Sequence, residues 1–280
     1  MSAFPSSLSS SALATRLRAA GCVFAEEETR LLMSAASSAD ALAAMVERRT
    51  AGHPLEHVLG WAEFCGMRMD VGDGVFVPRR RSEFLVDQAA AVCGEGAVVL
   101  DLCCGSGALG AALAARAGRV ELHSADVEPA AVRCARRNVA AVGGHVYEGD
   151  LYEPLPAGLR GRVDVLLANV PYVPAEEVGL LPPEARIHEP LIALDGGSDG
   201  LDVLRRVAAE APRWLVPGGC LLVETSERQV GAAVGTVAGS GLTSRVAVSE
   251  ELCATVVIGT RPRGKPPGSS TGGFQGVSAK

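Results

Sequence analysis

A side-chain amide, a proline and an aromatic ring come together in the short segment Asn169-Val170-Pro171-Tyr172. The apolar run at 163–168 predicts a buried strand that ends where the amide begins. A carboxamide has two N–H donors and one carbonyl acceptor, so Asn169 could hold another planar amide or amino group in a fixed plane. Pro171 restricts Val170 to an extended conformation, and Tyr172 supplies an aromatic wall. Taken alone, Asn169 is better explained as a strand-terminal residue that forms an Asx-turn before the proline.

A glycine-rich loop is the second segment that could bind a ligand. It reads DLCCGSGALG over residues 101–110 and lies between an apolar run and a small-residue helix. Gly105 and Gly107 permit a tight turn and a close approach of a ligand to the backbone. With Gly110 they also fit dinucleotide-binding loops, so the glycines alone do not separate a nicotinamide cofactor from S-adenosylmethionine. Asp101 favours S-adenosylmethionine, because its carboxylate would attract the cationic groups of that cofactor and repel a pyrophosphate.

Two carboxylates stand at the ends of the next two predicted strands. Asp126 comes 19 residues after Gly107, where the acid of a nucleotide site accepts hydrogen bonds from ribose hydroxyls. Asp150 ends the third strand at the same edge. The alternative for Asp126 is a cap of the following helix, and the alternative for Asp150 is a turn or cap residue. Together the three strand ends predict a pocket for an adenosine moiety.

The segments around these motifs alternate between strand and helix patterns. The helical patterns lie at 199–212 and 227–239 as well as after the first two strands. Such alternation indicates an α/β protein with a mostly parallel sheet covered on both faces. The last two strands leave little room for a crossover helix, so we expect one of them to be antiparallel. The seven predicted strands are at 97–102, 120–126, 145–150, 163–169, 218–225, 243–249 and 253–259.

The region before the glycine loop has a different pattern. Residues 8–50 are rich in Ala, Leu, Arg and Glu and predict a small helical bundle with breaks at Gly21 and near Ser38. The next segment, at 52–78, predicts a connector that contains a β-hairpin. Ser82 is expected to N-cap a helix that extends to about residue 92.

Composition argues against several classes of protein. The 280 residues carry a net charge of -6, which argues against loose binding of nucleic acid, because such binding depends on basic patches. The run Arg79-Arg80-Arg81 could contact an acidic partner or RNA, or it could be a solvated charged turn. The eight cysteines form no CxxC spacing, so we expect no metal site. Without a secretory signal or a membrane-spanning apolar run, the expected location is the cytoplasm.

At this point the sequence resembles a known family, the HemK/PrmC protein-(glutamine-N(5)) methyltransferases, which are class I S-adenosylmethionine-dependent methyltransferases. That family carries Asn-Pro-Pro-Tyr where this chain has Asn169 to Tyr172. Three further segments are similar to the family, and the resemblance extends to about residue 260. These segments are HPLEHVLGWAEFCGMRM, VPRRRSEFLVDQA and RIHEPLIALDGGSDGLDVLRR.

The resemblance implies transfer of a methyl group to the side-chain amide nitrogen of a protein glutamine, in a peptide-chain release factor. It implies a Rossmann-like catalytic domain behind an N-terminal substrate-recognition domain, and we expect a monomer. The residues expected to bind and orient the substrate are Asn169, Val170, Pro171 and Tyr172. Of these, the resemblance implies that Asn169, Pro171 and Tyr172 are catalytic. The residues expected to bind S-adenosylmethionine are Cys103, Cys104, Gly105, Ser106, Gly107, Asp126, Asp150, Leu151 and Asn169. The expected parts are a helical domain, a linker with the hairpin, the methyltransferase domain and a disordered tail, at 1–52, 53–80, 81–260 and 261–280.

Two residues depart from the family pattern. The family usually has Gly where Cys103 stands and Pro where Val170 stands. We expect Cys103 to have a negative φ, because a side chain is disfavoured in the left-handed region. Two other interpretations of the site therefore stay open. One is a methyltransferase for another planar nitrogen, in a nucleobase or a small molecule. The other is a non-catalytic adenosyl-binding protein.

Overall fold

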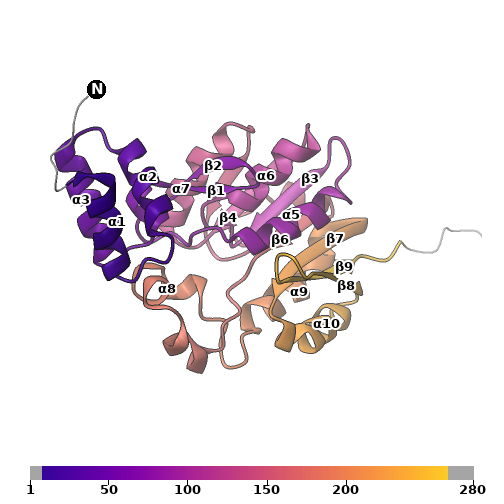
Figure 1. The fold of residues 1–280 in the computed structure, drawn as a ribbon. Helices are drawn as coiled ribbons and strands as arrows, with labels where there is room; N and C mark the ends of the chain where they lie inside the picture. The colour runs from indigo at the N-terminus through magenta and orange to yellow at the C-terminus, as the bar shows by residue number, and fades with distance from the viewer. Residues whose placement is uncertain (1–7, 264–280) are drawn as a thin grey trace, which may run out of the picture.

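The computed structural model describes residues 8–263 (Figure 1). Within these residues a seven-stranded sheet has the order β5-β4-β3-β6-β7-β9-β8. The strands β3 to β7 are parallel to one another, and β9 is antiparallel to both β7 and β8. The predicted α/β class, the seven strands and the antiparallel strand are confirmed. The strands are β3 (Val98–Leu102), β4 (Glu121–Asp126), β5 (His145–Glu148), β6 (Val163–Ala168), β7 (Leu215–Thr225), β8 (Thr243–Ser249) and β9 (Ala254–Thr260).

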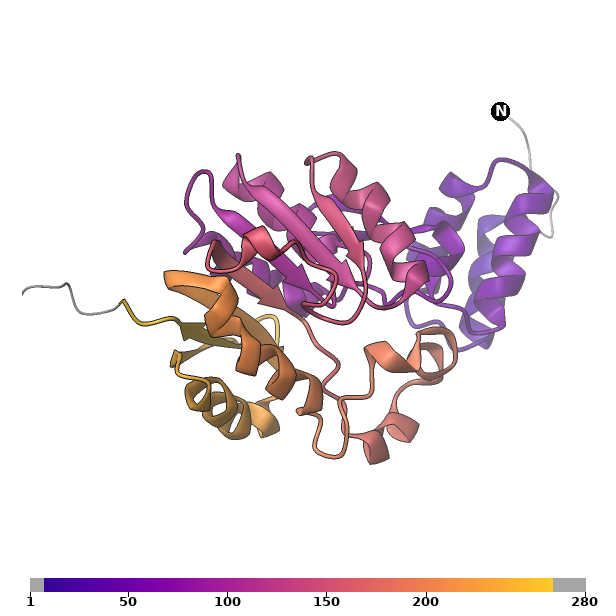
Figure 2. The ribbon, with the colours of Figure 1, turned by 180° about the vertical axis from the view of Figure 1, so that it is seen from behind.

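The sheet is buried on both faces, which explains why its strands read as continuous apolar runs. Successive side chains of a strand point to opposite faces, so Leu100 and Leu166 belong to one core and Val99 and Val165 to the other. Two helices pack on the first face and three on the second (Figures 1 and 2). The face that carries Leu100 is covered by α9 (Asp202–Trp214) and α10 (Val230–Gly239). The face that carries Val99 is covered by α5 (Glu83–Ala90), α6 (Ala108–Ala117) and α7 (Pro129–Ala140).

The strand order places a topological switch point at the centre of the sheet. From β3 the chain continues outward through β4 and β5, and then returns to β6 on the other side of β3. Leu102 pairs with Ala125 of β4 and with Ala168 of β6, so the three strands end at the same level. The loops that follow these strands therefore meet at one edge, which is where open α/β sheets bind ligands.

The N-terminal helices form a separate small core. They are α1 (Ser10–Ala19), α2 (Ala25–Ala35), α3 (Ala39–Thr50) and the short α4 (Leu55–Leu59). Their apolar residues, such as Leu17, Leu32 and Leu42, are fully buried against one another. Gly21 lies in the turn between α1 and α2 and has a φ of 96°. The Ser38 side chain caps α3 by accepting from the backbone N–H of Ala41. The helices predicted at 8–50 and both breaks are confirmed, whereas α4 lies in the segment predicted as a connector.

The connector contains the predicted hairpin, formed by β1 (Trp61–Phe64) and β2 (Met67–Asp70). The prediction for Ser82 is wrong. This residue ends a 3₁₀ turn that leads into α5, and its φ of -71° and ψ of -9° are helical, so its hydroxyl does not cap the helix. The helix also ends at Ala90, two residues earlier than expected.

The long segment between β6 and α9 contains a short α-helix, α8 (Pro183–His188), and a 3₁₀ helix on either side of it, none of which the sequence pattern revealed. In Figures 1 and 2 this segment lies beside the N-terminal helices, and Arg49 of α3 forms an ion pair with Glu184 of α8 at 2.8 Å. Of the predicted tail at 261–280, residues 264–280 lie outside the described part of the chain. Across the described residues, every helix is too short or too polar to cross a membrane.

Candidate active site

A cavity of about 690 Å³ opens at the carboxyl edge of the sheet. Its size is that of a pocket for a small molecule or cofactor. Its wall comes from the glycine loop, the turn after β6, the segment around α8 and the N-terminal helices. The predicted site residues that line it are Cys103, Cys104, Gly105, Ser106, Asp126, Asp150, Leu151, Asn169, Val170, Pro171 and Tyr172.

Gly107 is the one predicted site residue that the structure places away from this wall. It has a φ of 77° and stands at the start of α6. A Cβ atom there would lie 3.1 Å from Ala135 of α7. The glycine is therefore explained by close packing of two helices rather than by a ligand.

The carboxylate of Asp126 is held by the backbone at the wall of the cavity. Its Oδ2 accepts from the N–H of Gly105 at 2.8 Å, and its Oδ1 accepts from the N–H of Glu128 at 2.9 Å. Burial raises its pKa above the ordinary value. The side chain thus ties the glycine loop to β4. Its contact with Glu128, which is itself the N-cap residue of α7, is a turn contact and not the helix cap of the alternative interpretation.

Asp101 occupies a different place from the one we expected. Because side chains alternate along β3, it points toward α6, where its Oδ2 accepts from the N–H of Gly110 at 3.0 Å. It is fully buried and does not line the cavity, so the expected direct attraction of a cationic ligand is wrong. Burial raises the pKa of this carboxyl to about 7. Its Oδ1 finds no hydrogen-bond partner among residues 8–263.

Two residues of the cavity wall have left-handed backbone conformations. Cys103 has a φ of 53° and Leu151 a φ of 48°. The prediction of a negative φ for Cys103 is wrong, because the loop requires a left-handed residue at this point whether or not it is glycine. Such a conformation costs a side-chain residue about 1–2 kcal/mol. Burial also raises the pKa of the Cys103 thiol well above its ordinary value, so the sulfur is a neutral, apolar part of the wall.

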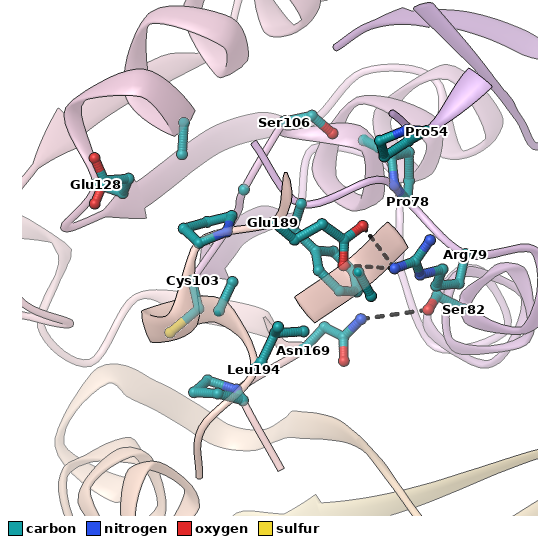
Figure 3. Close-up of a pocket in the computed structure, with 18 of the residues that line it drawn as sticks. Pro54, Pro78, Arg79, Ser82, Cys103, Ser106, Glu128, Asn169, Glu189 and Leu194 are labelled. Atoms are coloured by element: carbon teal, nitrogen blue, oxygen red, sulfur yellow. Dashed lines mark hydrogen bonds and ion pairs between the residues drawn. The ribbon is translucent and has the colours of Figure 1, made fainter. Parts of the chain in front are cut away.

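The amide of Asn169 is oriented by one specific contact. Its Nδ2 donates to the hydroxyl of Ser82 at 3.3 Å, and Figure 3 shows the carbonyl oxygen turned away from that hydroxyl. Ser82 is buried, at 2% exposure, so water does not compete strongly for this bond. The hydrogen bonds of residues 8–263 include no Asx-turn at Asn169. The carbonyl end of the amide is therefore available to a ligand.

Tyr172 presents its ring to the cavity while its hydroxyl points into the protein. The hydroxyl donates to Glu224 Oε1 at 3.0 Å and accepts from Arg81. Burial, with the nearby charge of Glu224, raises the pKa of the phenol. The sequence analysis missed Glu224, although an acid inside the apolar run CLLVET was a signal that could have identified it.

The arginine run is used inside the molecule. Arg79 donates to both oxygens of the buried Glu189 at 2.6 Å, as Figure 3 shows, and Arg81 donates to Glu224 at 3.0 Å. Neither interpretation of the run, a partner contact or a solvated turn, describes these two residues. Arg80 is exposed and has no ion pair among the described residues, whereas Arg81 is ion-paired although 46% of its side chain is exposed.

The comparisons with known proteins agree with this geometry. A family model described as "Methyltransferase small domain" matches residues 64–181. A solved methyltransferase from Pyrococcus furiosus has a TM-score of 0.54 at 16% identity and covers 70% of this chain and 90% of its own, so it shows the fold alone.

Two curated relatives are considerably more similar in sequence. The "4-amino-L-phenylalanine/4-methylamino-L-phenylalanine methyltransferase" of Streptomyces pristinaespiralis is 36% identical over 66% of this chain and 65% of its own length. The "Release factor glutamine methyltransferase" of Geobacter sulfurreducens is 38% identical over 70% of this chain and 69% of its own length. The same name recurs among further relatives at similar identity. The chain therefore belongs to the release factor glutamine methyltransferase family and is a methyltransferase.

Proposed function

We propose that this protein transfers a methyl group from S-adenosylmethionine to the side-chain amide nitrogen of a glutamine in a peptide-chain release factor. The observation that carries the proposal is the amide of Asn169, which Ser82 orients within the same cavity as the glycine loop. The names of the relatives support the substrate, and the family supports the cofactor.

The residues at the glycine loop fit S-adenosylmethionine. Asp126 would accept hydrogen bonds from the ribose hydroxyls, and Leu151 would flank the adenine. The backbone of Gly105 and Ser106 would lie against the methionine part, because neither residue has a large side chain there. Asp150 is paired with Arg206 at 2.6 Å, which reduces the excess of negative charge on this wall. When bound, the cofactor supplies a methyl group already activated for transfer by its sulfonium.

The role of the protein in the reaction is mainly to position the acceptor. The carbonyl of Asn169 would accept from an N–H of the substrate amide and hold its nitrogen in line with the methyl group. Alignment of this kind can supply about 7 kcal/mol or more of the barrier. The raised pKa values of Tyr172 and Cys103 make both residues poor bases at neutral pH. A strong base is not required, because a methylated, protonated amide loses its proton readily to water.

The protein substrate would reach the cavity between α2 and the segment around α8. Both sides of this opening carry apolar side chains at the cavity, with Phe24 just before α2 and Leu31 on it, and Leu181 near α8. In this proposal residues 1–52 form the substrate-recognition domain, residues 53–80 the linker and residues 81–260 the methyltransferase domain. The enzyme would act on its protein substrate as a monomer, without a metal and without direct contact to nucleic acid, in the cytoplasm.

The test is methyl transfer from isotopically labelled S-adenosylmethionine to purified release factors, followed by peptide mass mapping. A label on a glutamine, present with the wild-type chain and absent with Asn169→Ala, is the expected result. Parallel reactions contain 4-amino-L-phenylalanine, chosen because of the second relative, and ribosomal RNA. A label on either of these and none on the release factors would overturn the proposed substrate. Equilibrium dialysis with the cofactor, without acceptor, tests the cofactor separately.

A further inference from the structure

A buried charge lies behind the active-site turn and outside the cavity wall. Glu224, one residue before the carboxyl end of strand β7, is 2% exposed. One of its oxygens accepts from Arg81 and from Tyr172, each at 3.0 Å. The other oxygen has no partner within the described part of the chain. Removing a carboxylate from water costs free energy, and a protein with well-packed apolar residues in place of a buried ion pair is often at least as stable. The charge therefore calls for an explanation other than stability.

The position of Glu224 gives Tyr172 a single orientation. The tyrosine hydroxyl accepts from Arg81 and donates to Glu224, so its one proton is used and the ring plane is fixed. The backbone of the same residue is held as well, because its carbonyl accepts from the side chain of Gln229 at 2.9 Å. A Cβ atom at Gly200 would overlap this carbonyl, which shows how closely the backbone is enclosed.

The same arrangement also includes the side-chain amide of Asn169. Arg81 and Ser82 are neighbours in the chain, and they hold Tyr172 and Asn169 respectively. Both polar side chains of the active-site turn are thus fixed by two successive residues. Glu224 anchors that pair of residues to the sheet through its ion pair with Arg81.

We propose that Glu224 is a positioning residue for methyl transfer. Through Arg81 and Tyr172 it keeps the turn from Asn169 to Tyr172 in the conformation that presents the Asn169 amide to the acceptor. This inference rests on the proposed function, since it assigns a role within the same reaction. It predicts that Glu224 and the Tyr172 hydroxyl act as one unit, so that loss of either has nearly the effect of losing both.

A double-mutant cycle with Glu224→Gln and Tyr172→Phe tests this unit. We expect each single variant to lower kcat for the glutamine acceptor by about tenfold, while the KM for S-adenosylmethionine changes less than about twofold. The double variant is expected to be within about threefold of the slower single variant. Two effects that multiply, or a normal kcat for Glu224→Gln, would overturn the proposal.

Thr225→Val is the matched control. Thr225 follows Glu224 in the same strand and is also buried, and its hydroxyl has no partner among residues 8–263. This variant is expected to keep the wild-type kcat, so a loss with Glu224→Gln alone cannot be assigned to general disturbance of β7.

A measurement without substrate separates this inference from the proposed function. The chain contains three tyrosines, so labelling with 3-fluorotyrosine gives few ¹⁹F NMR resonances, and Tyr172→Phe assigns the one of interest. Glu224→Gln is expected to shift that resonance, and Thr225→Val to leave it in place. If wild-type protein methylates no glutamine but the resonance shifts, the proposed function fails. If the resonance does not move in Glu224→Gln, the inference fails whatever the substrate.

Discussion

The amide nitrogen of Asn169 donates to the hydroxyl of Ser82 across 3.3 Å, although 87 residues separate the two in the chain. An isolated carboxamide can present either its nitrogen or its oxygen to a ligand, because its terminal rotation is broad and roughly twofold. The serine hydroxyl selects one of the two orientations. The proposed recognition of the substrate by Asn169 would therefore depend on Ser82, which lies outside both segments that the sequence marks as ligand-binding.

Asn169→Ala removes the proposed contact with the substrate amide. We expect kcat to fall by at least about 100-fold, similar to the loss of one oriented polar contact in other enzymes. The affinity for S-adenosylmethionine should change little, because the loop and Asp126 remain. Label transfer to a release factor and equilibrium dialysis measure the two quantities. Near-normal turnover of the alanine variant would show that Asn169 does not orient the acceptor.

Ser82→Ala tests the orientation separately from the amide itself. Without the hydroxyl, Asn169 keeps its chemistry but can rotate, so we expect kcat to fall by about tenfold with cofactor affinity unchanged. Ser82→Thr should restore most of the activity, because threonine keeps the hydroxyl. Equal activity of the alanine and threonine variants would rule out the role assigned to this hydrogen bond.

Substitutions at Cys103 test the left-handed backbone of the cofactor loop. Cys103→Gly relieves backbone strain in the folded state but raises the conformational entropy of the unfolded chain. These two effects oppose each other, so the free energy of unfolding should stay within about 1 kcal/mol of the wild type. Cys103→Val places a β-branched side chain at the same φ and should lose about 2 kcal/mol or more. Urea unfolding gives the comparison. A valine variant as stable as the glycine variant would mean that the loop is not held in this conformation.

Asp101→Asn should change how stability depends on pH. The pKa of this buried carboxyl is about 7 in the folded chain against an ordinary 3.8, so the folded state favours the protonated form. Its contribution to the free energy of unfolding is full below about pH 4 and is lost as pH rises through about 7. The asparagine variant has no such loss and keeps a carbonyl for the N–H of Gly110.

The stability of Asp101→Asn relative to the wild type should therefore grow between about pH 4 and pH 7, by up to about 4 kcal/mol. Urea unfolding at several pH values across this interval measures the difference, and other titrating groups largely cancel in it. A constant difference between the two proteins would show that Asp101 is ionised in the folded chain throughout the interval.

The fold could be predicted from local patterns because the sheet is buried on both faces. Apolar runs such as 163–168 identify strands directly, and the rule that ligands bind at strand ends then gathers Asp126 and Asn169 without further information. The contacts of Ser82 and Glu224 could not be predicted, because they join side chains far apart in the chain. The φ of Cys103 is set by the geometry of the loop and not by the residue itself, and the glycine usual in the family at this position was the signal for it.

The contacts that organise the site also determine when it can form. The bonds from the turn at residues 79–82 to Asn169, Glu189 and Glu224 close chain segments of 87, 110 and 143 residues. Contacts so distant in sequence form slowly, because loop-closure entropy is lost before they can contribute. A nascent chain that ends before β7 contains Asn169 and Ser82 but lacks Glu224. Full activity would therefore arise late in folding, only when β7 has joined the sheet.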